Sequence, residues 1–535
     1  MNLYKNKFRT LTVGLLSVVA LSFNSCDIEE INPSKVSLDK VVSETQKAEN
    51  LLNGCYDALQ MPYLYKGGQN TNGVRDHDAI SDCGYNNWAT GLSEIANGAH
   101  DANSDLIRGF WKANYTGISR CNLFIETYKN QDFEKKEQYI HEALFLRALY
   151  YFHLTNYYGN VPLILKPVDT NEAYYLTPTS RSKIMDQIIS DLKLALDVLP
   201  YKHKVSASEY FRVSKGAVLG LLTRVYLYQA SRMDPNNNDS WIWEQITGEV
   251  TDEAEAQKYY KLAKESASRL MSNEFQYDLN PAYSSLFDGT NENGIESIFE
   301  VQFTTGVGEG EAFSGTYKNP QPWIVPTIEF VSTFEKNDGT EITTETANDI
   351  LLNEMDPRYY TTVLMTGQEW LGEVWTGSGI NYGSDPYTKF ALRKYVRNQQ
   401  GFFADGDRNF MVIRYADILL MFAEAKIKLG EIDADMFDAV DLVRKRVDMP
   451  VWDREDTDIY SLFEKIQKER LRELGMEGLR YQDLIRWGVY SEIAMRVPSA
   501  KYNDIFDYKR YVWPVPQIEC DNNRSEEGLQ NPMWR

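Results

Sequence analysis

Residues Glu469–Trp487 read ERLRELGMEGLRYQDLIRW, and this stretch decides the fold. It joins the end of a helix predicted over Ile459–Leu474 to a second helix predicted over Leu479–Trp487. Apolar residues that recur at helical spacing are core candidates: Leu474, Leu479, Leu484 and Trp487. Charged residues three and four positions apart are expected to form ion pairs on the helix surface: Glu473, Glu477 and Arg480. The stretch thus predicts two helices connected by a short turn.

The same amphipathic spacing elsewhere predicts a mainly α-helical chain. Further helices are predicted over Lys136–Tyr158, Arg181–Leu199, Ser208–Gln229, Glu253–Met271, Met411–Leu429 and Asp435–Val447. Ser206 or Ser208 is available as the N-cap of the helix that ends at Gln229. Because short turns separate helices that partly form antiparallel pairs, we expect a scaffold of tetratricopeptide-like helical hairpins.

Two long irregular stretches interrupt this pattern. Gly67–Ser104 is rich in Gly, Asn and Asp, whereas Ala282–Asp407 mixes turns with short β-type runs such as Ile295–Thr304. Long irregular segments of a compact protein are usually functional. We therefore divide the body into an N-terminal helical region (41–281), a loop-rich region expected to bind a ligand (282–410), and C-terminal helices with a tail that packs back on the scaffold (411–535).

Residues 1–25 are expected to be a signal peptide. A basic start is followed by the apolar run Leu11–Phe23, which is too short to span a membrane. The residues up to Cys26 resemble a bacterial lipobox, which implies cleavage before Cys26 and acylation of that cysteine. A plain secretory signal with an incidental cysteine is the alternative. Residues 26–40 would then be a lipidated tether, and their acidic start at Asp27–Glu30 resembles a signal for display on the outer cell surface.

The charge of the chain limits its partners. It has 56 Lys and Arg against 77 Asp and Glu, giving a net charge of −21. Because residues 1–25 carry three basic residues and no acidic one, the remainder holds −24. This balance argues against nucleic acids, polyanionic glycans and anionic lipid headgroups as partners.

Catalytic and metal-binding motifs are incomplete. His141-Glu142 begins an HExxH-like pattern, but position 145 is Phe. The stretch that begins at Asp234 imitates a calcium loop but has Asp239 in place of the glycine and Gln245 in place of the bidentate glutamate. We therefore predict no metal, no cofactor and no catalytic residue, although a glycosidase carboxylate pair is defined in space and stays open. The cysteines of the body are interpreted as inert free thiols: Cys55, Cys83, Cys121 and Cys520.

Four blocks in a fixed order identify a family. They are RALYYFHLTNYYGNVPL (147–163), RYADILLMFAEA (414–425), the stretch quoted first (469–487), and WPVPQIE (513–519) with a closing QNP (530–532). Together with the lipoprotein leader they resemble the SusD/RagB family of outer-membrane nutrient-binding lipoproteins. The resemblance implies a helical, tetratricopeptide-like scaffold with long irregular loops and a few short strands. We interpret the tyrosines and Phe152 of the first block as packing between helices.

The resemblance also implies a function. A SusD-like protein would be a non-catalytic receptor, anchored in the outer membrane by lipid and exposed on the cell surface. It would capture an oligosaccharide or polysaccharide and pass it to a SusC-like TonB-dependent porin. A neutral glycan fits a body with a charge of −24. Peptide cargo, as in the RagB branch, and a surface hydrolase remain alternatives.

Aromatic residues in the two irregular stretches are candidates for the ligand site. A sugar ring presents an apolar face and an edge of hydroxyls, which suit flat aromatic side chains and nearby polar groups. The candidates of the first stretch are Tyr85, Asn87 and Trp88, with Arg75 and Asp76 as polar partners. Those of the second stretch are Tyr317, Trp323, Trp370 and Trp375. Trp241 and Trp243 are expected to pack rather than to bind.

Overall fold

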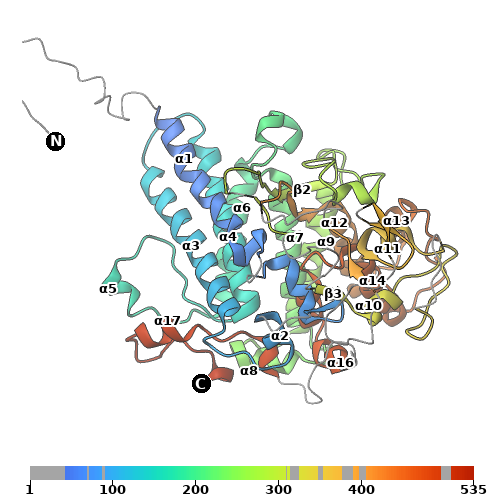
Figure 1. Ribbon diagram of the computed structural model, residues 1–535. Helices are drawn as coiled ribbons and strands as arrows, with labels where there is room; N and C mark the ends of the chain where they lie inside the picture. Colours follow the sequence, from blue (N-terminus) through green and yellow to red (C-terminus); the bar gives the residue numbers. More distant parts are fainter. Residues whose placement is uncertain are drawn as a thin grey trace, which may run out of the picture. The chain divides into compact units, whose positions relative to one another are not determined.

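Helices dominate the fold, confirming the predicted mainly α-helical class (Figure 1). The computed structural model describes residues 43–68, 72–86, 91–308, 310–313, 324–347, 354–370, 372–375, 390–396, 405–495 and 508–535. Thr45–Arg535 forms one compact unit. Its buried core draws residues from all three regions of the body, from Ala48 near the start to Leu529 near the end.

The long helices pack against one another in sequence order. They are α1 (Glu44–Asp57), α3 (Asp105–Tyr128), α4 (Lys136–Tyr158), α6 (Arg181–Val198), α7 (Lys215–Met233), α9 (Glu253–Leu270), α12 (Tyr415–Lys428), α13 (Ala434–Lys445) and α14 (Ile459–Leu474). Helix α4 contacts both α3 and α6, α7 contacts both α6 and α9, and α12 contacts α9, α13 and α14. This succession is the hairpin scaffold that the amphipathic spacing predicted.

Shorter helices decorate the scaffold. They are α2 (Gly91–Ala96), α5 (Thr170–Ala173), α8 (Ser240–Thr247), α10 (Ile328–Ser332), α11 (Pro357–Thr362), α15 (Arg480–Arg486), α16 (Tyr490–Met495) and α17 (Gln517–Asn522), with the 3₁₀ helix η5 (Val74–Ile80). In the described part of the chain, no helix is both long and apolar enough to cross a bilayer.

Four antiparallel strand pairs hold the irregular stretches. β1 (Gly84–Asn86) pairs with β3 (Ile324–Pro326), and β2 (Ser297–Val301) pairs with β8 (Phe410–Arg414). β4 (Val363–Leu364) pairs with β7 (Ala391–Leu392), and β5 (Glu369–Trp370) pairs with β6 (Glu373–Val374). β2 lies inside the β-type run predicted over Ile295–Thr304. Since a lone two-stranded ribbon is marginal in water, these pairs depend on the scaffold beneath them.

The aromatic residues of the first block pack between helices, as predicted. Tyr150, Tyr151, Phe152, Tyr157 and Tyr158 are all buried. Helix α3 approaches the ring of Tyr150 so closely at Gly117 that a Cβ there would lie 2.4 Å from it. Trp513 of the C-terminal tail stacks edge-on against Tyr157, and its backbone N–H donates to the Tyr157 carbonyl at 2.7 Å. The tail therefore packs back on the helical core.

The prediction of surface ion pairs at Glu473, Glu477 and Arg480 is wrong, because all three residues are buried. Glu473 forms ion pairs with Arg414 and Arg446, and Glu477 forms an ion pair with Lys394 at 2.7 Å. A larger buried ionic network continues from these pairs through Asp356, Arg358, Glu296, Glu335, Arg444, Glu469 and Arg472. The charges satisfy one another inside the core rather than facing water.

Two carboxylates of this network, Glu469 and Glu473, are held in the ionised form. Burial alone would raise the pKa of Glu469, but the guanidinium groups of Arg358, Arg444 and Arg472 lower it to about 2. The pKa of Glu473 is likewise well below its ordinary value, because Arg446, Arg414 and Arg358 outweigh its burial. Opposite charges at hydrogen-bond distance favour the charged form of each acid.

The predicted start of one helix was also wrong. Helix α7 begins at Lys215, and its N-cap is Ser214, whose side chain accepts a hydrogen bond from the backbone N–H of Ala217. Ser206 and Ser208 instead lie at a separate 3₁₀ turn, Ala207–Glu209.

The cysteines of the body differ in burial. Cys55, Cys83 and Cys121 are buried, and Cys520 is partly buried. Cys26 lies outside the described residues.

Candidate functional site

The pairing of β1 with β3 brings the two irregular stretches together. Asn86, the last residue of β1, lies opposite Ile324, the first residue of β3. Because the pair is antiparallel, the chain leaves β1 and enters β3 at the same end of the ladder. Trp88 follows Asn86 by two residues, and Trp323 directly precedes Ile324. The chain therefore leaves β1 toward Trp88 and enters β3 from Trp323 at the same end of one small ladder.

The motif that opened the sequence analysis anchors this ladder through η5. Asp78 accepts hydrogen bonds from the backbone N–H groups of Gly478 at 3.1 Å and Arg480 at 2.9 Å. The Arg480 guanidinium also donates two hydrogen bonds, of 2.8 and 2.7 Å, to the Asp82 carboxylate. Burial raises the pKa of the Asp78 carboxyl to about 7, against the opposing effect of its backbone donors. The conformation of the C-terminal motif thus fixes the segment that leads into β1.

Glycine is required where η5 meets this motif. Gly478 has a φ of +81°, and a Cβ there would lie 2.2 Å from the carbonyl oxygen of Val74. Only a residue without a side chain allows the two backbones to approach this closely.

Arg75 and Asp76 belong to η5, which contacts β1, and they bind each other. The Asp76 carboxylate accepts from Arg75 Nε at 2.9 Å and Nη2 at 2.7 Å. The guanidinium of Arg75 also lies over the ring of Phe313, 4.9 Å from its centroid, and donates to the Phe313 carbonyl. Since Phe313 lies 11 residues before Ile324, this contact links η5 to the part of the second stretch that precedes β3.

The remaining candidates fall into two groups. Tyr85 is buried beside Val325, while Trp370 and Trp375 are each only 6% exposed and belong to the main core. In the structure, neither tryptophan presents an open ring face to solvent. The other predicted residues lie outside the described part of the chain: Asn87, Trp88, Tyr317 and Trp323.

The tryptophans that were expected to pack lie elsewhere. Trp243 is buried and stacks on the Arg232 guanidinium at 3.4 Å from the ring centroid. Trp241 remains 43% exposed, with one edge against Tyr508.

A polar pocket is lined mainly by residues of the first irregular stretch, Gly67–Ser104. It has a volume of about 610 Å³, and its wall includes Asn72, which follows residues 69–71, and Gly91, which follows residues 87–90. Other lining residues are Tyr63, Glu94, Asp101, Asn103 and Asp105. Amides and carboxylates of this kind can bond sugar hydroxyls, whereas the three acids oppose an anionic ligand. Sequence reasoning did not single out Tyr63, Asn72 or Asn103 of this wall, although the Asn-rich composition of Gly67–Ser104 pointed to the segment that holds the two asparagines.

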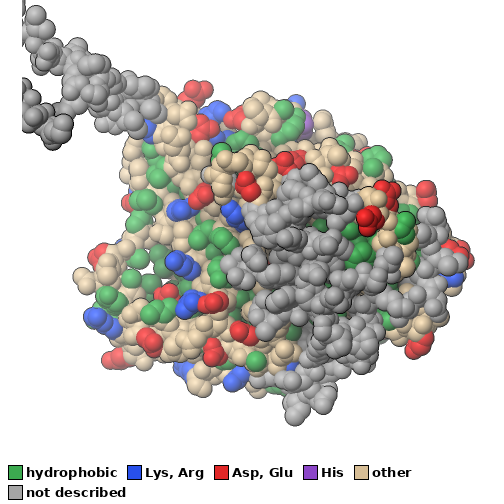
Figure 2. Space-filling model, in the orientation of Figure 1, with side chains coloured by type: hydrophobic (Ala, Val, Ile, Leu, Met, Phe, Trp, Pro, Cys, Tyr) green, Lys and Arg blue, Asp and Glu red, His purple; other side chains and the backbone are tan. Residues whose placement is uncertain are grey.

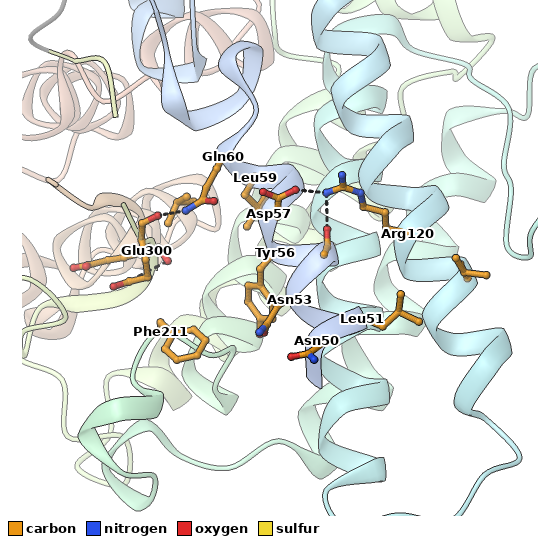
Figure 3. Close-up of a pocket in the computed structure, with 14 residues that line it drawn as sticks. Asn50, Leu51, Asn53, Tyr56, Asp57, Leu59, Gln60, Arg120, Phe211 and Glu300 are labelled. Atoms are coloured by element: carbon orange, nitrogen blue, oxygen red, sulfur yellow. Dashed lines mark hydrogen bonds and ion pairs between the residues drawn. The ribbon is translucent and has the colours of Figure 1, made fainter. Parts of the chain in front are cut away.

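Another pocket contains no predicted site residue. It has a volume of about 680 Å³ and lies beside α1, α3 and the end of β2 (Figure 3). Several of its polar side chains are already engaged by neighbouring elements. Arg120 donates to the Gly54 carbonyl and to Asp57, and Gln60 donates to the Gln302 carbonyl at 2.6 Å. These bonds hold the surrounding elements together and leave fewer groups for a ligand.

Among the described residues, no group of three or more His, Cys, Asp or Glu side chains is arranged to hold a metal ion. Asp234, from the calcium-like stretch, instead pairs with Lys428 at 2.9 Å and accepts a bond from the Tyr260 hydroxyl.

Two family models match the chain. The model of the SusD family matches residues 295–534, and a model described as starch-binding associating with outer membrane matches residues 28–227. SusD-like protein P2 of Formosa agariphila is 24% identical over 96% of this chain and 97% of its own length. SusD-like protein P38 of the same organism is 23% identical over 95% of this chain and 96% of its own length.

Solved structures share the fold. A SusD-like carbohydrate binding protein from Bacteroides fragilis has a TM-score of 0.75 and 24% identity, covering 90% of this chain and 98% of its own. A laminarin binding SusD-like protein has a TM-score of 0.66 and 24% identity, covering 91% of this chain and 98% of its own. These likenesses extend over nearly the whole described scaffold.

Proposed function

Because the chain belongs to the SusD/RagB family, we propose that it is a cell-surface receptor that binds a glycan and passes it to a SusC-like TonB-dependent transporter. In this proposal the protein is anchored to the outer membrane by lipid on Cys26 and has no catalytic role. The family description of starch binding at the outer membrane supports it, as do fold neighbours described as carbohydrate binding and laminarin binding.

One observation supports the site assignment: the chain leaves β1, two residues before Trp88, at the same end of the ladder at which it enters β3, directly after Trp323. Two indole rings from separate segments can form a stacking platform for the apolar faces of sugar rings. The polar pocket beside Asn72 and Gly91 would supply groups that bond the hydroxyl edge. Its three acids and the net charge of −21 favour a neutral glycan.

One acid with a raised pKa lines an open pocket, and among the described residues it lacks the second carboxylate that a glycosidase needs, which supports a receptor. Retaining and inverting glycosidases need two carboxyl groups that flank one bond, one of them with a raised pKa. Burial raises the pKa of Glu519, which lines an open pocket, but no other carboxylate lines that pocket in the described part of the chain. Glu469 and Glu473 have lowered pKa values and are enclosed by arginines.

Titration of the soluble chain, residues 27–535, with neutral and anionic polysaccharides tests this proposal. We expect calorimetry to detect binding to at least one neutral glycan of a panel that includes laminarin and starch, and none to alginate. No binding to any neutral glycan by the folded chain, or release of new reducing ends from one, would contradict the proposal. Peptides that copurify with the protein instead would favour the RagB-like alternative.

A further inference from the structure

A second open pocket lies between α3, the segment around α5, and α17. Its volume is about 530 Å³, within the usual range of small-molecule sites. Figure 1 shows α5 and α17 as neighbours at the left, and Figure 2 shows the surface hollowed there. The backbone N–H of Arg524, just after α17, donates to the carbonyl of Tyr174, just after α5, at 2.6 Å. This hydrogen bond joins the two segments on one side of the pocket. We call this hollow the α3–α17 pocket.

Aromatic residues form rigid parts of its wall. Trp111 and Tyr115 of α3 pack with ring centroids 4.8 Å apart, and the Tyr115 hydroxyl donates to the Pro162 carbonyl at 2.8 Å. Tyr174 is half-buried, and the Arg524 guanidinium lies 4.2 Å from its ring centroid. Because these contacts fix the rings in advance, a ligand that stacks on them loses little additional conformational freedom of the protein.

Polar groups without partners line the same pocket. Glu519 is half-buried, and no described residue donates a hydrogen bond to its carboxylate or pairs with it. Lys112, on the opposite element, also forms no ion pair with a described residue. The pocket therefore offers both a free acceptor and a free donor beside aromatic surface.

This combination suits a neutral polar ligand. The wall carries charges of both signs, Glu519 against Lys112 and Arg120, so a charged ligand would be attracted by one group and repelled by another. A neutral sugar has hydroxyls that both donate to Glu519 and accept from Lys112, and its ring face can lie on the half-buried rings of Tyr115 or Tyr174.

We propose that the α3–α17 pocket is a second binding site for a sugar unit of the captured glycan. This inference rests on the proposed function. None of the lining residues belongs to the two irregular stretches, so the pocket is separate from the ladder-end site. Two sites on one receptor strengthen the binding of a long chain, because the second contact forms at a high effective concentration.

Tyr174→Ala separates the two sites experimentally. Laminarin and laminaritriose, or starch and maltotriose, are titrated by calorimetry into the wild-type chain and its variants. We expect Tyr174→Ala to weaken polysaccharide binding by about tenfold or more, while the trisaccharide binds the ladder-end site unchanged. Tyr175→Ala is the matched control, since Tyr175 is 59% exposed, adjacent in sequence, and absent from the pocket wall.

Glu519→Gln provides a second variant that preserves shape. It removes the charged acceptor, and we expect it to weaken polysaccharide binding in the same direction as Tyr174→Ala. Unchanged polysaccharide affinity in both variants would overturn the second site and leave the proposed function standing. If the wild-type chain binds no glycan at all, the proposed function itself fails and the inference falls with it.

Discussion

Replacing Glu473 by Gln is expected to lower the free energy of unfolding by about 3–5 kcal/mol, as found when one partner of a buried ion pair is removed. The Glu473 carboxylate accepts from Arg414 at 2.6 Å, Arg446 at 2.5 Å and Arg358 at 3.0 Å, and its side chain is fully buried. Glutamine keeps the volume but removes the charge and directs an NH₂ group at a guanidinium. Three arginines would then lose a shared counter-charge that water cannot replace.

The measurement is urea unfolding followed by circular dichroism. Glu464→Gln is the matched control, because Glu464 lies on the same helix α14 but is exposed. A variant at position 473 as stable as the one at position 464 would show that the buried network does not require this charge.

Trp88→Ala and Trp323→Ala should each weaken glycan binding by at least tenfold, and the double variant should abolish measurable binding. Each substitution removes the flat apolar face on which a sugar ring would stack. Circular dichroism checks that each variant is folded before its binding is measured. Calorimetry against the best neutral glycan of the panel measures the effect.

Trp241→Ala is the matched control for these variants. Trp241 is a partly exposed tryptophan that contacts the ring of Tyr508. Neither residue belongs to the irregular stretches Gly67–Ser104 and Ala282–Asp407. If Trp241→Ala weakens binding as much as the other two variants, or if neither Trp88 nor Trp323 matters, the site assignment is wrong.

Local patterns in the sequence predicted the helical scaffold well. The spacing of apolar residues in Lys136–Tyr158 marked α4 at its observed bounds, since helix periodicity is a property of neighbouring residues. The same local reasoning failed for Glu473, whose partners Arg358 and Arg414 are 115 and 59 residues away. Spacing along one helix cannot reveal a partner contributed by another element.

The candidate site was predictable only in part. The composition of Gly67–Ser104 indicated a functional loop, but the mutual pairing of Arg75 with Asp76 and the burial of Trp370 depend on tertiary packing. The decisive observation, that β1 pairs with β3, joins segments about 240 residues apart and has no local signature.

Amide hydrogen exchange with and without saturating glycan tests the central claim most directly, because it locates the bound ligand along the chain. We expect added protection in residues 84–95 and 313–327, at the ladder end and in the segments attached to it. Protection confined to other regions, with these two segments unchanged at saturation, would contradict the assignment of the glycan site to the end of the β1–β3 ladder.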